Sequence, residues 1–380
     1  MRTVKILSLL LLVIVALSPR LTTAQPTIGG IINDYTPVIS ITGADCSSTV
    51  TVESAQKFAV GDLVLLIQMQ GAAIFFNPDP SFGSIKNYGG AGLYEFNRIK
   101  KITGTTIELD QVIGRPFNVS GKVQLIRVPE FTDVQITTDL TCLPWDGSIG
   151  GVLALKASGV VTVSAPITVK GLGFRGGEYY RMIYDCGHTQ YFCDGSSIDG
   201  ANKGEGISSS LFQYQRARGA MANAGGGGND HNAGGGGGSN YGAGGFGGCE
   251  WSGCSIRNLE TRGIGGYPLQ YSTTLNTVYM GGGAGAGHDN DQSATPGGKG
   301  GGIVIIQANE LKGTNPVIDA RGVNADSVLV VGQDGGGGGG AGGAVLLDVK
   351  NYTSTLLIKA GGGDGATTIF QGGHVGPGGG

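Results

Sequence analysis

Glycine is concentrated in three blocks that restrict what the second half of this chain can fold into. The blocks occupy residues 225–248, 281–302 and 335–343, and most of the 75 glycines of the chain lie after residue 140. Glycine-rich segments are either flexible linkers or, because glycine lacks a Cβ, closely packed extended segments of polyproline-II type. Linkers join domains, whereas these blocks adjoin strands of one repeating unit and contain aromatic residues such as Tyr241 and Phe246. We therefore favour ordered packing.

Three segments after residue 140 share one pattern. They occupy residues 150–171, 301–322 and 342–361, and each has a glycine pair, an apolar strand, a polar turn, a second strand and a closing glycine. No helical segment separates the two strands of a unit. The pattern predicts stacked β-hairpins or the rungs of a β-solenoid.

The first part of the chain predicts a small β domain. β-branched or alternating segments at 37–41, 48–52, 62–69, 105–109 and 123–128 are separated by turn residues. Their order is similar to that of small SH3-like barrels. We predict an all-β chain: a signal peptide at 1–24, a small barrel-like domain at 25–145, and a glycine-rich β-repeat domain at 146–380, solenoid-like or sandwich-like and containing polyglycine segments.

The first 24 residues have the three parts of a secretory signal peptide. Arg2 and Lys5 precede a short apolar core, which is followed by the small residues 22–24. The apolar core is shorter than the ~20 residues that span a bilayer, and no later segment is apolar enough to do so. The net charge is −3 and basic residues are not clustered, which argues against nucleic acid as a partner. We predict a secreted protein, extracellular or at the cell surface, without a membrane span in the mature chain.

The six cysteines all follow the predicted cleavage site, and an even number in an exported chain favours disulfides. Neighbours in sequence suggest the pairs Cys186/Cys193 and Cys249/Cys254, and Cys46 with Cys142 would join the two ends of the first domain. Sequence alone does not choose among the fifteen pairings. A zinc site is the weaker interpretation, because no histidine spacing matches Cys249 and Cys254.

Two polar clusters, 229–232 and 288–291, follow glycine runs and combine histidine with aspartate and asparagine. Such oxygen donors suit calcium, and the histidines suit a transition metal. The candidate metal ligands are Asp230, His231, His288, Asp289 and Asp291. The alternative is that these residues accept backbone donors in tight glycine turns.

Aromatic residues gather in the insertion at 178–218, where they are candidates for binding a sugar or protein surface or for covering the edge of the repeat domain. The candidates for surface binding are Tyr179, Tyr180, Tyr184, Tyr191 and Phe192. Carboxylates that a glycosidase would require are present, but no pair is distinguished and no catalytic motif occurs. Those carboxylates are Asp185, Asp194, Glu205, Glu250 and Asp319, and we assign no catalytic residue.

The order of motifs resembles a known family, the glycine-rich secreted surface proteins of Bacteroidota-type bacteria. The motifs are FAVGDLVLLIQMQGA, GLYEFNRI, VQLIRVP, WDGSIGGVLAL, GFRGG, KGEGI, RGAMANAGGGGNDHNAGGGGGSNYGAGGFGG, MGGGAGAGHDND and GGGIVII. The resemblance implies type IX export and an adhesin-like or surface-layer role, and it supplies no catalytic residue. Such proteins usually end in a sorting domain, whereas this sequence ends in HVGPGGG, so we expect either a fragment or another export route.

These observations favour a noncatalytic surface or extracellular-matrix protein with an adhesive or scaffold role, whose partners are glycans or other surface proteins. One alternative is a polysaccharide lyase or hydrolase on a β-solenoid. The other is a calcium-stabilised module that binds glycans or proteins. Calcium is the one candidate cofactor, and the oligomeric state is left open.

Overall fold

The computed structural model describes residues 25–44, 47–182, 186–209, 211–254, 259–272, 274–291, 293–328, 334–368 and 378–380. The predicted signal peptide at 1–24, Cys46, Tyr184 and Asp185 lie outside the described residues. In this part of the chain, no helix has the length and apolar character needed to cross a bilayer.

Strands dominate the secondary structure, which confirms the prediction of an all-β chain. The barrel and its hairpin contain β2 (Asp34–Ala44), β3 (Ser47–Val52), β4 (Leu63–Gln68), β5 (Ala73–Ile74), β6 (Ile85–Asn87), β7 (Tyr94–Thr103), β8 (Thr106–Leu109) and β9 (Val123–Arg127). The parallel sheet contains β1 (Thr27–Ile31), β10 (Glu130–Phe131), β11 (Val134–Thr141), β12 (Val152–Ala157), β13 (Val160–Val163), β14 (Ile167–Thr168), β15 (Ile303–Gly313), β16 (Val317–Asp319), β17 (Ala344–Tyr352) and β18 (Leu357–Lys359). Two short 3-10 helices are η1 (Val119–Gly121) and η2 (Phe212–Tyr214).

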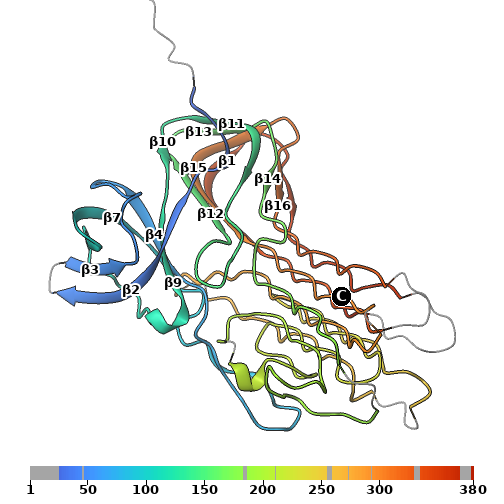
Figure 1. Ribbon diagram of the computed structural model, residues 1–380. Coiled ribbons are helices and arrows are strands. Elements are labelled where there is room, and N and C mark those ends of the chain that lie inside the picture. The colour runs from blue at the N-terminus through green and yellow to red at the C-terminus, as the bar shows by residue number, and fades with distance from the viewer. Residues whose placement is uncertain are drawn as a thin grey trace, which may run out of the picture.

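The first strands close into an antiparallel barrel in the order β2-β3-β8-β7-β4-β9, on the left of Figure 1. Strand β4 is buried along its whole length, because its two faces belong to different cores. Val64 and Leu66 pack inside the barrel, whereas Leu65 and Ile67 pack against the rest of the molecule. The uninterrupted apolar run of β4 is therefore what a strand with two covered faces requires.

The three segments with the shared pattern stack side by side in the parallel sheet. Val152 of β12 pairs with Ile303 of β15, which pairs with Ala344 of β17. Each of these residues directly follows the glycine pair of its segment, so the strand register reproduces the sequence alignment. The second strands stack in the same way, because β14, β16 and β18 are neighbours in the sheet.

The chain changes from barrel to parallel sheet earlier than the change in glycine content at 145/146. Strands β10 and β11 already pair with β12, β13 and β14, and β1 pairs with β11 at the start of the chain. Glycine content marks where the packed extended segments begin. It does not mark where strands change partners.

The glycine blocks at 225–248, 281–302 and 335–343 form a layer of extended segments that run side by side next to the parallel sheet, which we call the glycine bundle (Figure 1). Backbone hydrogen bonds link successive segments: the Gly285 N–H donates to the Gly236 oxygen at 2.9 Å, and the Gly338 N–H donates to the Gly285 oxygen at 2.9 Å. A Cβ placed on Gly285 would lie 1.9 Å from the Gly226 oxygen. The blocks are thus ordered and buried parts of the fold, and the linker interpretation is wrong.

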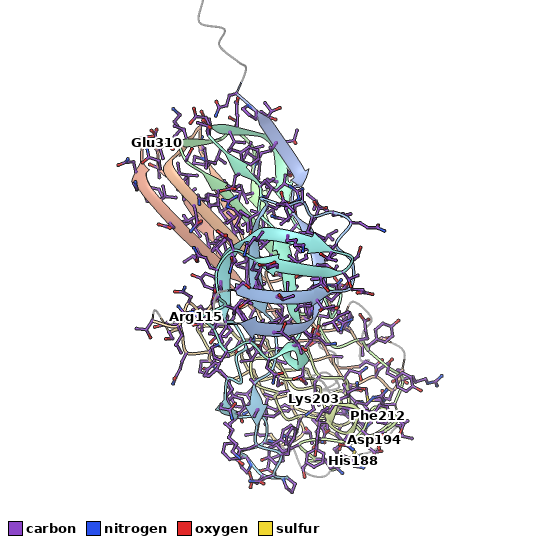
Figure 2. All side chains as sticks on the ribbon, turned by 90° about the vertical axis from the view of Figure 1, so that its left-hand side faces the viewer. Arg115, His188, Asp194, Lys203, Phe212 and Glu310 are labelled. Atoms are coloured by element: carbon purple, nitrogen blue, oxygen red, sulfur yellow. A yellow bond between two sulfur atoms is a disulfide. The ribbon has the colours of Figure 1, made fainter. Side chains whose placement is uncertain are left out.

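The barrel, the sheet and the glycine bundle share one hydrophobic core. It contains Ile67 of β4, Val152 of β12, Phe82 of the β5–β6 loop and Met280 beside the second glycine block. Polar contacts reinforce it, since the Tyr35 hydroxyl donates to the Val152 oxygen at 2.7 Å. Figure 2 shows the resulting elongated molecule, with Glu310 of β15 near one end and a group containing Lys203 and His188 near the other.

Candidate functional site

The two polar clusters lie next to each other inside the fold, although they are about sixty residues apart in sequence. Asp230 is fully buried, and its carboxylate accepts the backbone N–H groups of His188 at 2.7 Å and His231 at 3.0 Å. Burial raises the pKa of the Asp230 carboxyl. Asp230 therefore holds turn backbone, as in the second of the two interpretations of this cluster.

The second cluster is organised by a residue that the sequence analysis missed, Asp334. Its carboxylate accepts the N–H groups of Asn290 at 2.8 Å and Asp291 at 3.0 Å, together with that of Ser293. Burial raises the pKa of Asp334 to about 6, and a hydrogen bond with Asp289 adds to the effect. Asp334 directly precedes a glycine run, and Asp230 lies four residues before one. An aspartate close before a glycine run was therefore the sequence feature that could have identified Asp334.

His288 is buried beside the first cluster. Burial lowers the pKa of its imidazole to about 3, and the nearby His231 and His188 act in the same direction. Its Nδ1 atom has no hydrogen-bond partner among the described residues. Asp291, by contrast, is exposed.

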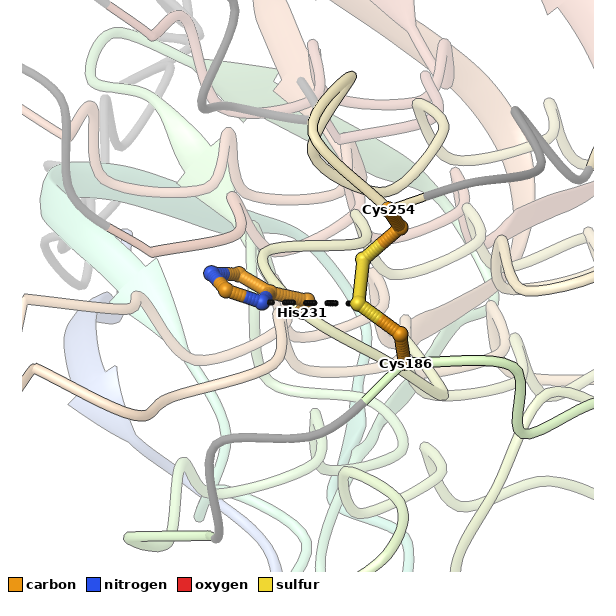
Figure 3. A group of neighbouring side chains, drawn as sticks. All are labelled: Cys186, His231 and Cys254. Atoms are coloured by element: carbon orange, nitrogen blue, oxygen red, sulfur yellow. Dashed lines mark hydrogen bonds between the residues drawn. A yellow bond between two sulfur atoms is a disulfide. The ribbon is translucent and has the colours of Figure 1, made fainter.

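Figure 3 shows the closest grouping of metal-ligating side chains in the described ranges, Cys186, His231 and Cys254, whose ligand atoms lie within 4.8 Å of one another. The Cys186 sulfur lies 3.9 Å from Nδ1 of His231, and it is bonded to the Cys254 sulfur in a disulfide. The grouping thus contains one of the five predicted metal ligands and no carboxylate. Calcium requires six to eight oxygen ligands, and this grouping does not provide them.

The disulfide between Cys186 and Cys254 corrects the pairing predicted from sequence. Cys193 and Cys249, the predicted partners, are free thiols. The glycine bundle places segments 68 positions apart side by side, so the nearest cysteine in sequence is not the nearest in space. Cys142 is a buried free thiol, and its predicted partner Cys46 lies outside the described residues.

The predicted aromatic residues divide into two groups. Tyr179 and Tyr180 are exposed, with the Arg216 guanidinium 4.3 Å from the Tyr180 ring centroid. Tyr191 and Phe192 instead pack on the shared core, where the Phe192 ring stacks on Phe82 at 5.1 Å. These two rings cover the core at this end of the molecule.

A tyrosine-lined groove runs along the junction of the barrel and the glycine bundle, and sequence analysis did not predict it. It consists of three adjoining pockets of 400, 360 and 410 Å³. The first and second pockets share Tyr88 and Gln270, and the second and third share Tyr271. We call the surface lined by these three pockets the tyrosine groove.

The tyrosine rings follow one another along the groove. Ring centroids are separated by 5.9 Å between Tyr88 and Tyr279, by 5.0 Å between Tyr279 and Tyr271, and by 6.4 Å between Tyr271 and Tyr241. Tyr241 is 81% exposed and Tyr271 is 39% exposed. The groove thus presents aromatic surface to solvent at its open end.

Hydrogen bonds fix the orientation of the inner rings. The Tyr271 hydroxyl donates to Oδ1 of Asn240 at 2.5 Å, and the Tyr88 hydroxyl accepts the N–H of Gln270 at 2.7 Å. Burial raises the pKa of Tyr279 to about 12 and also raises that of Tyr271. Both hydroxyls therefore stay protonated and uncharged at neutral pH.

A glycine permits the close approach of the barrel to the groove. Gly92 has a φ of +80°, and a Cβ at this position would lie 2.3 Å from the Tyr279 ring. Beside it, Leu93 bridges to Thr277 across the junction. The tyrosines come from three distant segments, and only Tyr241 lies within a glycine block.

A separate pocket of 280 Å³ contains two carboxylates, Glu178 and Glu205. Glu205 forms an ion pair with Arg175 at 2.9 Å and also accepts from Nε2 of Gln70 at 3.3 Å. Lys203 lines the same pocket and is buried. Its Nζ donates to the backbone carbonyl oxygen of Tyr191 at 2.5 Å. Burial lowers the pKa of Lys203.

The other carboxylates considered for catalysis have local roles. Asp194 accepts from the Ser196 hydroxyl at 2.6 Å, and Asp319 pairs with Arg321 at 2.6 Å. Glu250 is buried, at 5% exposure. None of these three lines a described pocket together with a second carboxylate.

Comparisons with known proteins place the chain in no family. The sequence matches no protein-family model and no curated protein. Two solved structures show a partial likeness. The gp54 tailspike of Acinetobacter baumannii bacteriophage AP22, in complex with A. baumannii capsular saccharide, is 13% identical over 36% of this chain and 25% of that chain, with a TM-score of 0.19. The gp49 tailspike of Pseudomonas phage LKA1 is 12% identical over 42% of this chain and 25% of that chain, with a TM-score of 0.18. The matches span about a quarter of either tailspike, and at these TM-scores they carry no argument about fold or function.

Proposed function

We propose that this protein is a noncatalytic, exported surface protein with an adhesive role, and that it binds glycans in the tyrosine groove. The groove is the observation that carries the proposal. Flat aromatic rings pack against the C–H faces of sugars, and neighbouring amide and hydroxyl groups bond to sugar hydroxyls. Tyr241 and Tyr271 provide the rings, and the exposed Gln270 provides an amide.

The construction of the groove supports this role. Its rings are held by the barrel on one side and by the hydrogen-bonded glycine bundle on the other. A rigid site loses little conformational entropy when a ligand binds, which favours affinity. Export is supported by the pattern of residues 1–24 and by the disulfide.

The proposal is tested by measuring the binding of the purified mature chain to an array of polysaccharides. Tyr241→Ala removes an exposed ring that the fold does not require, and we expect it to weaken binding about tenfold, the equivalent of ~1.4 kcal/mol. Tyr352→Ala is the matched control, because Tyr352 is 50% exposed on β17 and outside the groove. Equal binding by both variants would contradict a role for the groove.

The enzyme alternative has one observation in its favour, the pocket that contains Glu178 and Glu205. A glycosidase requires two carboxylates on either side of the bond that it cleaves. However, Glu205 is already paired with Arg175. Polysaccharide cleavage by the wild-type chain that is abolished in Glu205→Gln would replace the noncatalytic proposal with this one.

A further inference from the structure

We infer that the tyrosine groove selects neutral glycans over acidic ones, an inference that rests on the proposed function. The second and third pockets have no lysine, arginine, aspartate or glutamate among their described lining residues. Their polar side chains are amides and hydroxyls: Ser239, Asn240, Gln270, Ser272 and Thr277, together with the tyrosines.

These groups match the hydrogen-bonding character of an uncharged sugar. Amides and hydroxyls both donate and accept, as sugar hydroxyls do. The exposed Gln270 carries such an amide. Asn240 is buried and positions the Tyr271 ring, because its Oδ1 accepts from the Tyr271 hydroxyl while its Nδ2 donates to the Gly342 oxygen at 2.9 Å. The side chain is thereby fixed with its amide against the groove wall.

An acidic sugar lacks a partner over most of the groove. A carboxylate moved from water to an uncharged wall loses hydration without gaining a counter-ion, which is unfavourable. The whole chain adds to this effect, since its net charge is −3. Acidic glycans are therefore excluded by the wall and by the overall charge.

Positive charge occurs only at the margins of the described groove. Lys86 lines the first pocket, where its ammonium lies 6.0 Å from the Phe75 ring centroid. Arg115 lies beside the second pocket, and its Nη1 donates to the Thr274 oxygen at 3.4 Å. The central stretch between Tyr88 and Tyr241 is left uncharged.

The inference is tested with the mature chain and two polysaccharides, a neutral glucan or galactomannan and a polyuronate, each at low and high salt. We expect binding to the neutral polymer with an affinity that salt does not change, because screening acts only on charges. Stronger binding to the polyuronate that is lost in Tyr241→Ala would overturn the selectivity and leave the proposed function standing. Binding to neither polymer nor to any other glycan would overturn both.

A gain-of-binding variant tests the cause of the selectivity. Gln270 is exposed and lines two pockets, so Gln270→Lys adds a cation without removing a described side-chain contact. We expect affinity for the polyuronate to rise about fivefold, the effect of one charge near a surface. Gln111→Lys adds the same charge on an exposed barrel residue outside the groove. An equal rise in both variants would show that net charge, and not the uncharged wall, excludes acidic polymers.

Discussion

The packing of the glycine bundle predicts that one methyl group at Gly285 destabilises the whole molecule. A Cβ at this position would lie 1.9 Å from the Gly226 oxygen, whereas an ordinary contact is above 3.4 Å, so two segments must separate by more than an ångström. Overpacking of this kind costs about 1–3 kcal/mol. The separation also strains the hydrogen bonds of Gly285 with Gly236 and Gly338, at about 1 kcal/mol each.

Alanine partly offsets this cost, because it lowers the entropy of the unfolded chain by about 0.4–1 kcal/mol relative to glycine. The net expectation for Gly285→Ala is a loss of about 2–5 kcal/mol in the free energy of unfolding, measured by urea denaturation. Gly242→Ala is the matched control in the same protein, since a Cβ there meets nothing within 4 Å. It should leave stability unchanged or raise it slightly. Equal stability of the two variants would refute the close packing of the glycine segments.

Four further predictions follow from the buried polar clusters and the disulfide. Replacing Cys186 and Cys254 together with serine should cost about 4 kcal/mol by the loop-closure estimate for a separation of 68 residues, and a urea midpoint unchanged by the replacement would contradict this. Burial lowers the pKa of His288 to about 3 in the folded state, below its value in the unfolded chain. The free energy of unfolding therefore includes a contribution from the neutral imidazole at pH 7. This contribution is lost as the pH falls from about 6.5 to 3, at up to about 1.4 kcal/mol per pH unit. Asp334, with its raised pKa, acts in the opposite sense near pH 6 to 4, so the readout is the difference in unfolding free energy between wild type and His288→Leu, which should shrink on acidification; a difference independent of pH would argue against a buried neutral imidazole. Asp230→Ala should cost about 2–4 kcal/mol, because it leaves the buried N–H of His231 and the partly buried N–H of His188 without an acceptor, whereas Asp291→Ala at an exposed residue should change stability by less than about 0.5 kcal/mol. Addition of EDTA should leave the melting temperature unchanged, because the Asp230 carboxylate already accepts backbone donors. A lower melting temperature in EDTA would instead support a bound calcium ion.

The barrel and the parallel sheet were predictable because their information is local. Alternating strands such as β3 and the apolar run of β4 have recognisable periods. The repeat alignment also supplied the register of β12, β15 and β17, since parallel strands with the same pattern stack in register. Order in the glycine blocks at 281–302 and 335–343 was predictable for a similar reason, because each leads directly into a strand, β15 or β17. The block at 225–248 has no adjoining strand, so the expectation that strands hold both ends of each block was wrong.

The disulfide partner, Asp334 and the tyrosine groove were not predictable in this way. Each depends on which glycine segments become neighbours, and glycine runs carry no side-chain pattern that specifies their partners. Tyr88, Tyr241 and Tyr271 come from three segments whose proximity exists only after the bundle has formed. Asp230 fits the turn alternative that the sequence offered for its cluster, because its carboxylate accepts two backbone N–H groups.

The glycine bundle has a consequence for the temperature dependence of stability. It buries peptide groups and almost no apolar side chains, and the exposure of polar surface lowers the heat capacity of unfolding, whereas the exposure of apolar surface raises it. Per residue, this chain should therefore have a smaller heat-capacity change than a protein stabilised by a conventional core. Its stability curve becomes broader and flatter, and the fold keeps more of its stability on cooling than hydrophobic proteins of the same size.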